Sequence, residues 1–78
     1  YFVNEKEENT LEINSLNLNI IWAAKEAVYK YKKGKLEYYK EAMTVLSIEN
    51  DTLMVIVNGE LVKCTYLIQE DFVLVFIN

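Results

Sequence analysis

The chain has 78 residues, of which 53% are hydrophobic and 13% aromatic, and its formal net charge is −4 at pH 7. This composition excludes intrinsic disorder, and the acidic balance disfavours general nucleic-acid binding, which needs a basic face. A chain of this length forms a single small domain, residues 1–78, and buries only roughly 60% of the surface that it exposes when unfolded.

The counts of cysteine and histidine limit the cellular compartments and the kinds of chemistry that we expect for this chain. Cys64 is the only cysteine, so we expect no disulfide framework within the chain and a reducing, cytoplasmic compartment. No apolar run approaches about 18 residues, so no transmembrane helix is expected. The chain has no histidine, which excludes a histidine base or metal ligand. It begins at Tyr1 rather than Met, and we expect an upstream segment.

The first expected element is a short helix from Glu5 to about Ile13. Asn4 can cap this helix, and Glu7 three residues later completes a capping-box pattern. A disordered acidic lead-in is the alternative. The pattern breaks at Asn14-Ser15.

A long second helix is expected from Ser15 or Asn17 to about Lys33. Apolar residues recur there at helical spacing and make one face: Ile20, Ala24, Ala27, Val28 and Tyr31. Gly34 suits the position just after a helix end, and lysines in the last turn oppose the helix dipole.

After Gly34 the pattern changes from helical to alternating. Strands are expected at 39–49, 52–57, 61–68 and 72–77, separated by turns at Asn50-Asp51, Asn58-Gly59 and Gln69-Glu70-Asp71. Asn-Gly is the strongest short hairpin signal. The last strand is apolar throughout, which favours burial on both faces or against a partner. The predicted fold class is α+β: a short N-terminal helix and one long helix packed on an antiparallel meander of three to four strands.

The long helix carries the residues most capable of chemistry. Glu26 and Lys30 are four apart and share a face, with Trp22 one turn before Glu26. A carboxylate can hold a hard metal ion, and an ammonium one turn away can hold a phosphate. The ordinary interpretation is a solvated Glu–Lys pair contributing roughly 0.2–0.5 kcal/mol. Likewise Trp22 and Cys64 would ordinarily be core residues.

The order Trp22-x-x-Lys25-Glu26-Ala27-x-x-Lys30 resembles the Trp/Phe-x-x-Lys-Glu-Ala/Ser-x-x-Lys signature of the 4′-phosphopantetheinyl transferase superfamily. The segment 1–7 is similar to the family's Phe-Leu-x-x-x-Glu entry to the preceding helix, and 32–36 to the Lys/Gly-rich turn after it. The downstream strands follow the same order. The similarity covers nearly the whole chain and implies half of a phosphopantetheinyl transferase-like fold.

The resemblance implies transfer of the phosphopantetheine arm of coenzyme A to a serine of an acyl or peptidyl carrier protein, as in fatty-acid or secondary-metabolite synthesis. Glu26 would then be a Mg²⁺ ligand and the base, directly or through water. Lys30 would contact the coenzyme A pyrophosphate. Lys25 would make a weaker phosphate contact or a structural one, and Trp22 would pack and orient the helix. Phosphoryl transfer needs mainly positioning and charge neutralisation, which these residue types can supply.

The chain also departs from this family. The family takes further metal carboxylates from an upstream Gly-x-Asp-x-Glu strand, and neither Gly34 nor Gly59 begins such a sequence. A single carboxylate is a poor Mg²⁺ site. We therefore expect the chain to be the C-terminal part of a larger enzyme, inactive alone, with apolar surface on the long helix and last strand open to self-association or to pairing with the missing N-terminal part.

Three alternatives remain at the level of sequence. Trp22 favours the pseudo-dimeric type of transferase over the short homotrimeric type, where Phe is usual. A non-catalytic protein-interaction domain of the same fold would keep the helix and meander without a metal site. A nucleic-acid-binding domain using Lys30 to Lys35 is disfavoured by the acidic net charge.

Overall fold

A computed structural model describes residues 3–32 and 43–78 of the chain. The order of elements is α1 (Glu5–Thr10), α2 (Ser15–Tyr31), β1 (Met43–Glu49), β2 (Thr52–Val57), β3 (Glu60–Ile68) and β4 (Val73–Ile77). The α+β class and the four-stranded meander are confirmed, and the part of the expected first strand at 39–42 lies outside the described residues. No helix in the described parts is long and apolar enough to cross a membrane.

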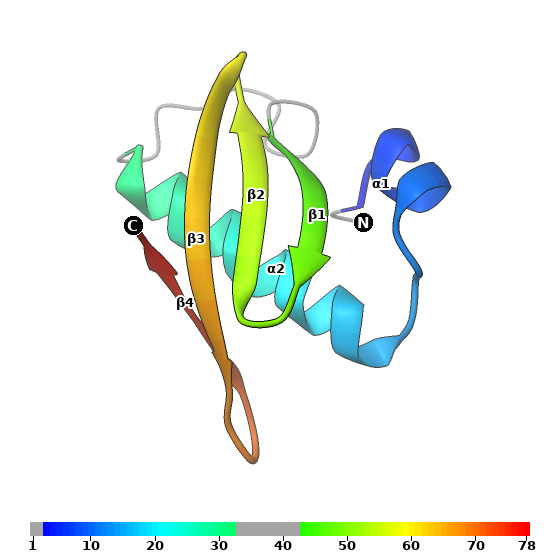
Figure 1. The fold of residues 1–78 in the computed structure, drawn as a ribbon, viewed down its shortest axis with the longest axis vertical. Helices are drawn as coiled ribbons and strands as arrows, with labels where there is room; N and C mark the ends of the chain where they lie inside the picture. The colour runs from blue at the N-terminus through cyan, green and yellow to red at the C-terminus, as the bar shows by residue number, and fades with distance from the viewer. Residues whose placement is uncertain (1–2, 33–42) are drawn as a thin grey trace.

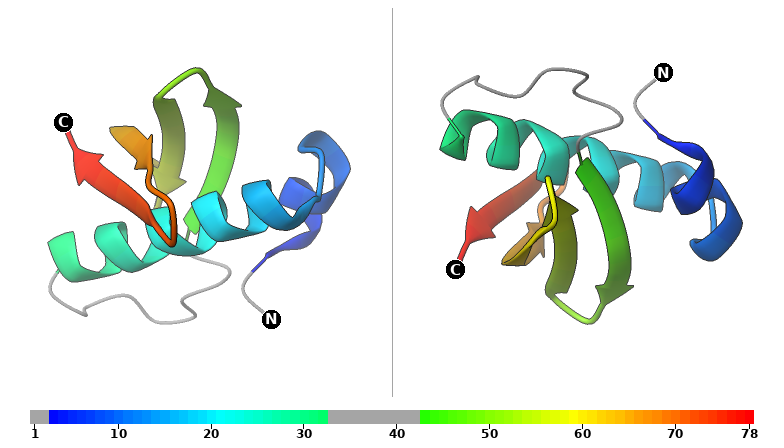
Figure 2. Two further views of the ribbon diagram at one scale, coloured as in Figure 1. Left: turned by 90° about the horizontal axis from the view of Figure 1, so that it is seen from below. Right: turned by 90° about the horizontal axis from the view of Figure 1, so that it is seen from above.

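The four strands form one antiparallel sheet in the order β1-β2-β3-β4. Helix α2 crosses one face of this sheet and lies close to β4, while α1 lies beside β1 (Figures 1 and 2). Both edges of the sheet are therefore near a helix, and α1 with its cap Asn4 forms hydrogen bonds to the edge strand β1.

The turns follow the sequence signals. Asn58 and Gly59 both have positive φ, 50° and 83°, as a two-residue type I′ hairpin requires. Asp51, in the preceding turn, also has positive φ, a conformation that Asp tolerates better than most residues. The predicted hairpin at Asn58-Gly59 is confirmed.

The caps decide the helix lengths. Asn4 caps α1 in a complete capping box with Glu7, and Asn14 caps α2 by accepting the N–H of Asn17. The prediction that the first helix reaches Ile13 was wrong, because Leu11 adopts an extended conformation and ends it. The predicted second helix from Ser15 is confirmed, with its C-cap at Lys32.

The core lies between α2 and the inner face of the sheet. Its buried apolar residues come from α2, β1, β2, β3 and the segment before α1, and none comes from α1 or β4. They are Val3, Ile20, Ile21, Ala24, Val28, Met43, Val45, Leu53, Val55, Val57, Val62 and Cys64. Alternation along β2, where Leu53, Val55 and Val57 are buried, is the pattern of a sheet covered on one face.

Strand β4 is covered on one face and exposed on the other. Its inward residues Val73, Val75 and Ile77 are partly buried against the core, whereas Leu74 and Phe76 are 39% and 48% exposed. Within the described chain β4 is therefore buried on one face only, which leaves burial against a partner as the open alternative and agrees with the apolar surface expected on the last strand. Its apolar outer face remains open along the described chain.

Candidate functional site

The signature residues of the long helix divide between its two sides. All of Trp22, Lys25, Glu26 and Lys30 lie on the single helix α2. Lys25 points into the protein and is fully buried, Glu26 is half-buried, and Lys30 is exposed. This division follows from the 3.6-residue repeat: Ile21, Lys25 and Val28 share the inward face, and Glu26 and Lys30 are neighbours beside it.

Lys25 forms a buried ion pair with Glu7 of α1. The distance from Lys25 Nζ to Glu7 Oε1 is 2.8 Å, and both side chains are fully buried. Removing two charges from water is costly, and such a pair persists only with good geometry and further hydrogen bonds. The Lys25 ammonium therefore tethers α1 to α2.

The Glu7 carboxylate has two further donors. The Asn4 N–H donates to Oε1 at 2.9 Å and the Val45 N–H donates to Oε2 at 2.6 Å. Charge-assisted bonds of this kind are stronger than neutral ones. One carboxylate thus joins α1, α2 and β1.

Asn4 extends this network to the backbone of β1. Its side-chain amide donates to Met43 O at 3.1 Å and to Thr44 Oγ1 at 2.9 Å, while its Oδ1 accepts the Glu7 N–H at 3.0 Å. No buried side-chain nitrogen or oxygen lacks a partner among the described residues. We call Asn4, Glu7 and Lys25 the buried polar corner.

The buried polar corner gives Lys25 a structural role. The resemblance left two roles open, a weak phosphate contact or a structural contact, and the observed contacts are structural. A coenzyme A phosphate could not reach this fully buried ammonium without rearranging the residues around it, Glu7 among them. The role of Glu7 was missed at the level of sequence, where it was read only as a capping residue. The available signal was the place of Lys25 between Ile21 and Val28 on the apolar face, which demands a buried anion nearby.

The expected Mg²⁺ site is not supplied by this part of the chain. The described residues contain no group of three or more His, Cys, Asp or Glu side chains placed to hold a metal ion. Glu26 is the carboxylate on the same side of α2 as Lys30. Mg²⁺ gives up its water ligands only for more than one carboxylate or for a carboxylate together with a bound phosphate. The residues therefore do not fit a Mg²⁺ site by themselves.

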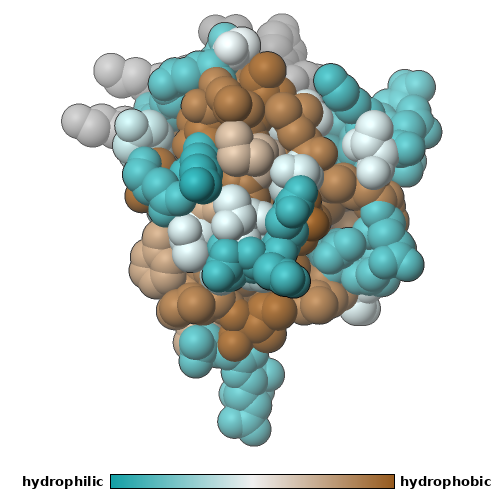
Figure 3. Space-filling model, viewed as in Figure 1, coloured by the Kyte–Doolittle hydropathy of each residue, from teal (hydrophilic) through white to brown (hydrophobic). Residues whose placement is uncertain are grey.

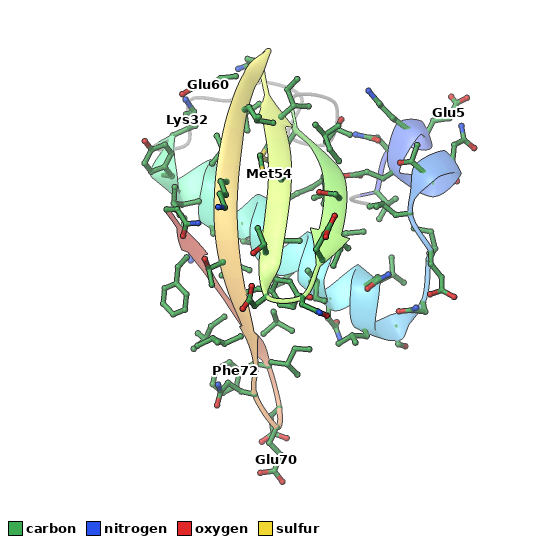
Figure 4. All side chains as sticks on the ribbon, viewed as in Figure 1. Glu5, Lys32, Met54, Glu60, Glu70 and Phe72 are labelled. Carbon is green, nitrogen blue, oxygen red and sulfur yellow. The ribbon has the colours of Figure 1, made fainter. Side chains whose placement is uncertain are left out.

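The C-terminal end of α2 is tied to β3. Lys32 Nζ lies 2.7 Å from Glu60 Oε2 and 5.7 Å from the centre of the Tyr31 ring (Figure 4). The hydrogen bond to Glu60 raises the pKa of Lys32. Of the lysines expected in the following turn, Lys33 and Lys35 lie outside the described residues.

Trp22 does not occupy the core position expected for it. Its side chain is 52% exposed and lines a groove of about 390 Å³ between the first half of α2 and the β3–β4 hairpin. We call this the hairpin groove; its lining residues are Leu16, Asn19, Trp22, Ala23 and residues 68–73. Phe72 and Glu70 lie at the hairpin end of the molecule (Figure 4).

A comparison with known proteins found no family model, curated protein or solved structure that matches the chain.

Proposed function

We propose that this chain is the C-terminal part of a 4′-phosphopantetheinyl transferase, which moves the phosphopantetheine arm of coenzyme A to a serine of a carrier protein. The observation that carries the proposal is the division of the signature on α2. Lys25 forms a structural ion pair with Glu7, which ties α2 to α1. The neighbouring residues Glu26 and Lys30 lie on the accessible side of α2.

In this proposal Lys30 binds the pyrophosphate of coenzyme A. Its ammonium is exposed at the end of a flexible stem and can follow the charge as it moves to the leaving group. Bound Mg²⁺ would neutralise further phosphate charge, but its remaining ligands must come from a segment other than the described one.

Glu26 accepts the proton of the carrier serine hydroxyl. The serine oxygen then forms a bond to the β-phosphorus of coenzyme A, and the bond from that phosphorus to the bridging oxygen breaks. Adenosine 3′,5′-bisphosphate leaves with that oxygen. Positioning and charge neutralisation account for most of the rate of such reactions.

The test is a transfer assay on the full parent chain with coenzyme A, Mg²⁺ and an apo carrier protein, read as the mass gain of the carrier. Glu26→Ala and Lys30→Ala should each lower kcat by at least about 10²-fold. Glu8→Ala and Lys63→Ala are matched controls, because both residues are exposed and lie away from α2. Absence of transfer by the parent, or full transfer by Glu26→Ala, would contradict the proposal.

A non-catalytic interaction domain is the second candidate, and the hairpin groove favours it. Exposed large apolar side chains in one groove are typical of protein-binding surfaces. A parent that binds a carrier or another protein without transferring the arm, and loses binding on Trp22→Ala while tolerating Glu26→Ala, would support this alternative.

A further inference from the structure

Strand β4 is an edge strand that carries no charge. Its sequence from Val73 to Ile77 is entirely apolar, its pairing with β3 is regular, and β3 is its one neighbouring strand among the described residues. Natural proteins usually blunt such edges with charges, proline, bulges or a covering segment. β4 has none of the first three.

The hydrogen bonds to β3 show which backbone groups of β4 point outward. The Asn78 N–H donates to Lys63 O, and the Gln69 N–H donates to Phe72 O. Because bonding alternates along an antiparallel strand, residues 74 and 76 also face β3. The N–H and C=O groups of Val73, Val75 and Ile77 therefore point to the outer edge.

We propose that two copies of this chain associate through β4, pairing antiparallel about a twofold axis at Val75. Val75 then lies opposite its own copy, and Val73 lies opposite Ile77 of the second copy. This register joins the outward-pointing groups of one strand to those of the other. Twofold pairing of this kind is self-complementary and closed, so it stops at a dimer.

Side chains and charges favour the same arrangement. On the outer face Leu74 and Phe76, now 39% and 48% exposed, lie opposite Phe76 and Leu74 of the second copy and cover each other. The charged residues nearest to β4 in the sequence, Glu70 and Asp71, precede it. Antiparallel pairing places these acidic residues of the two copies at opposite ends of the ladder, whereas parallel pairing would bring them together.

Figure 3 shows the outer face of the sheet, where hydrophobic surface gathers just above the hydrophilic tip of the β3–β4 hairpin. Its exposed members include Leu67 and Leu74, which lie opposite each other on β3 and β4. A dimer through β4 shields part of this surface. The inference does not depend on the proposed transferase function.

Sedimentation of the 78-residue chain from about 1 to 300 µM, the range in which micromolar dissociation constants are measured, tests the proposal. The expected result is a monomer–dimer equilibrium. Phe76→Lys should raise the dissociation constant at least about tenfold, because two like charges enter the ladder. Leu61→Lys is the matched control: Leu61 is also exposed on the outer face, at 58%, but lies at the start of β3. A monomer throughout, open-ended aggregates, or equal effects of the two variants would overturn the proposal.

A cysteine cross-link tests the register in a Cys64→Ala background. Val75→Cys places two thiols in directly paired positions about 5.5 Å apart between Cα atoms, within disulfide range. Leu74→Cys places them on a diagonal at roughly 7–8 Å, beyond that range. Mild oxidation should therefore give covalent dimer for Val75→Cys and little for Leu74→Cys. The reverse ranking, or no covalent dimer from either variant, would overturn the proposed pairing.

Discussion

The two edge strands of this sheet differ in how their outward backbone groups are treated: those of β1 are hydrogen-bonded to side chains, and those of β4 are not bonded to the described residues. On the edge of β1, α1 supplies bonds to the backbone: Asn4 donates to Met43 O, and Glu7 accepts the Val45 N–H. A register shift between Val45 and Ser47 further distorts that edge, as bulges on edge strands commonly do. On β4 the corresponding edge is regular, uncharged and without such bonds to the described residues.

At the β1 edge polar residues have a structural role, whereas the β4 edge is left as an open surface. The buried polar corner closes one edge and fixes α2 against it, so the chain commits three polar side chains to the interior. At the opposite edge apolar side chains remain partly exposed. Substitutions at each edge test how much that edge contributes to the stability of the fold.

Glu7→Ala should be the most damaging substitution within the buried polar corner. It leaves the Lys25 ammonium buried without its carboxylate and removes the acceptor of the Val45 N–H. Breaking a buried pair in this way costs about 3–5 kcal/mol, a large share of the stability of a small domain. Urea unfolding followed by circular dichroism measures the loss. Glu8→Ala, an exposed residue of the same helix, is the control, and similar losses for both would refute the importance of the corner.

Lys25→Met should cost less, about 2 kcal/mol. The carboxylate of Glu7 keeps its two main-chain donors, Asn4 N–H and Val45 N–H, and Met fills the space of the lysine stem. Lys30→Met on the exposed side of α2 should change stability by no more than about 0.5 kcal/mol. If Lys25→Met were as mild as this control, the ion pair would have no net structural value.

Asn4→Ala should cost about 1–2 kcal/mol, through loss of the α1 cap together with its bonds to β1. Asn14→Ala removes the cap of α2, which is exposed and makes no bond to the sheet, and should cost about 1 kcal/mol or less. The difference between the two thermal denaturation curves isolates the edge contacts. Equal costs would mean that Asn4 acts only as a cap.

Cys64 reports whether β4 stays closed over the core. It lies on the inner face of β3, paired with Ile77 of β4, and burial raises the pKa of its thiol. Since only the thiolate reacts readily, native Cys64 should be alkylated far more slowly at pH 8 than Leu67→Cys, an exposed position on β3, in a Cys64→Ala background. Equal rates would show that β4 opens often.

The raised pKa of this thiol also predicts a direction for stability against pH. Folding favours the protonated thiol, so this contribution is complete below the ordinary pKa of 9.0 and is lost as pH rises through the higher folded value. Cys64→Ala should remove that part of the decline. A decline of equal steepness in both chains would exclude Cys64 as its cause.

Local signals predicted the elements of this fold well, because each depends on neighbouring residues. Asn4, Asn14 and the Asn58-Gly59 turn all act within a few positions of themselves. The pairing of Glu7 with Lys25 spans 18 positions, and no local pattern identifies which carboxylate meets a buried lysine. The sequence likewise could not show that Trp22 is half exposed, because its exposure depends on where the β3–β4 hairpin lies.

The smallest expected effect is that of charge on β4 itself. Phe76→Lys, measured at a concentration where the chain is monomeric, should change the free energy of unfolding by about 0.5 kcal/mol or less, because the side chain is half exposed on the outer face. The same charge placed at Val45 would enter the core, which is fully buried there, and should prevent folding. If the two substitutions were equally harmful, β4 would be as essential to the core as β1. If only Val45→Lys is harmful, β4 completes the sheet while leaving its edge and outer face available. The additional stability that Phe76→Lys loses at high concentration, beyond its effect on the monomer, then measures the association.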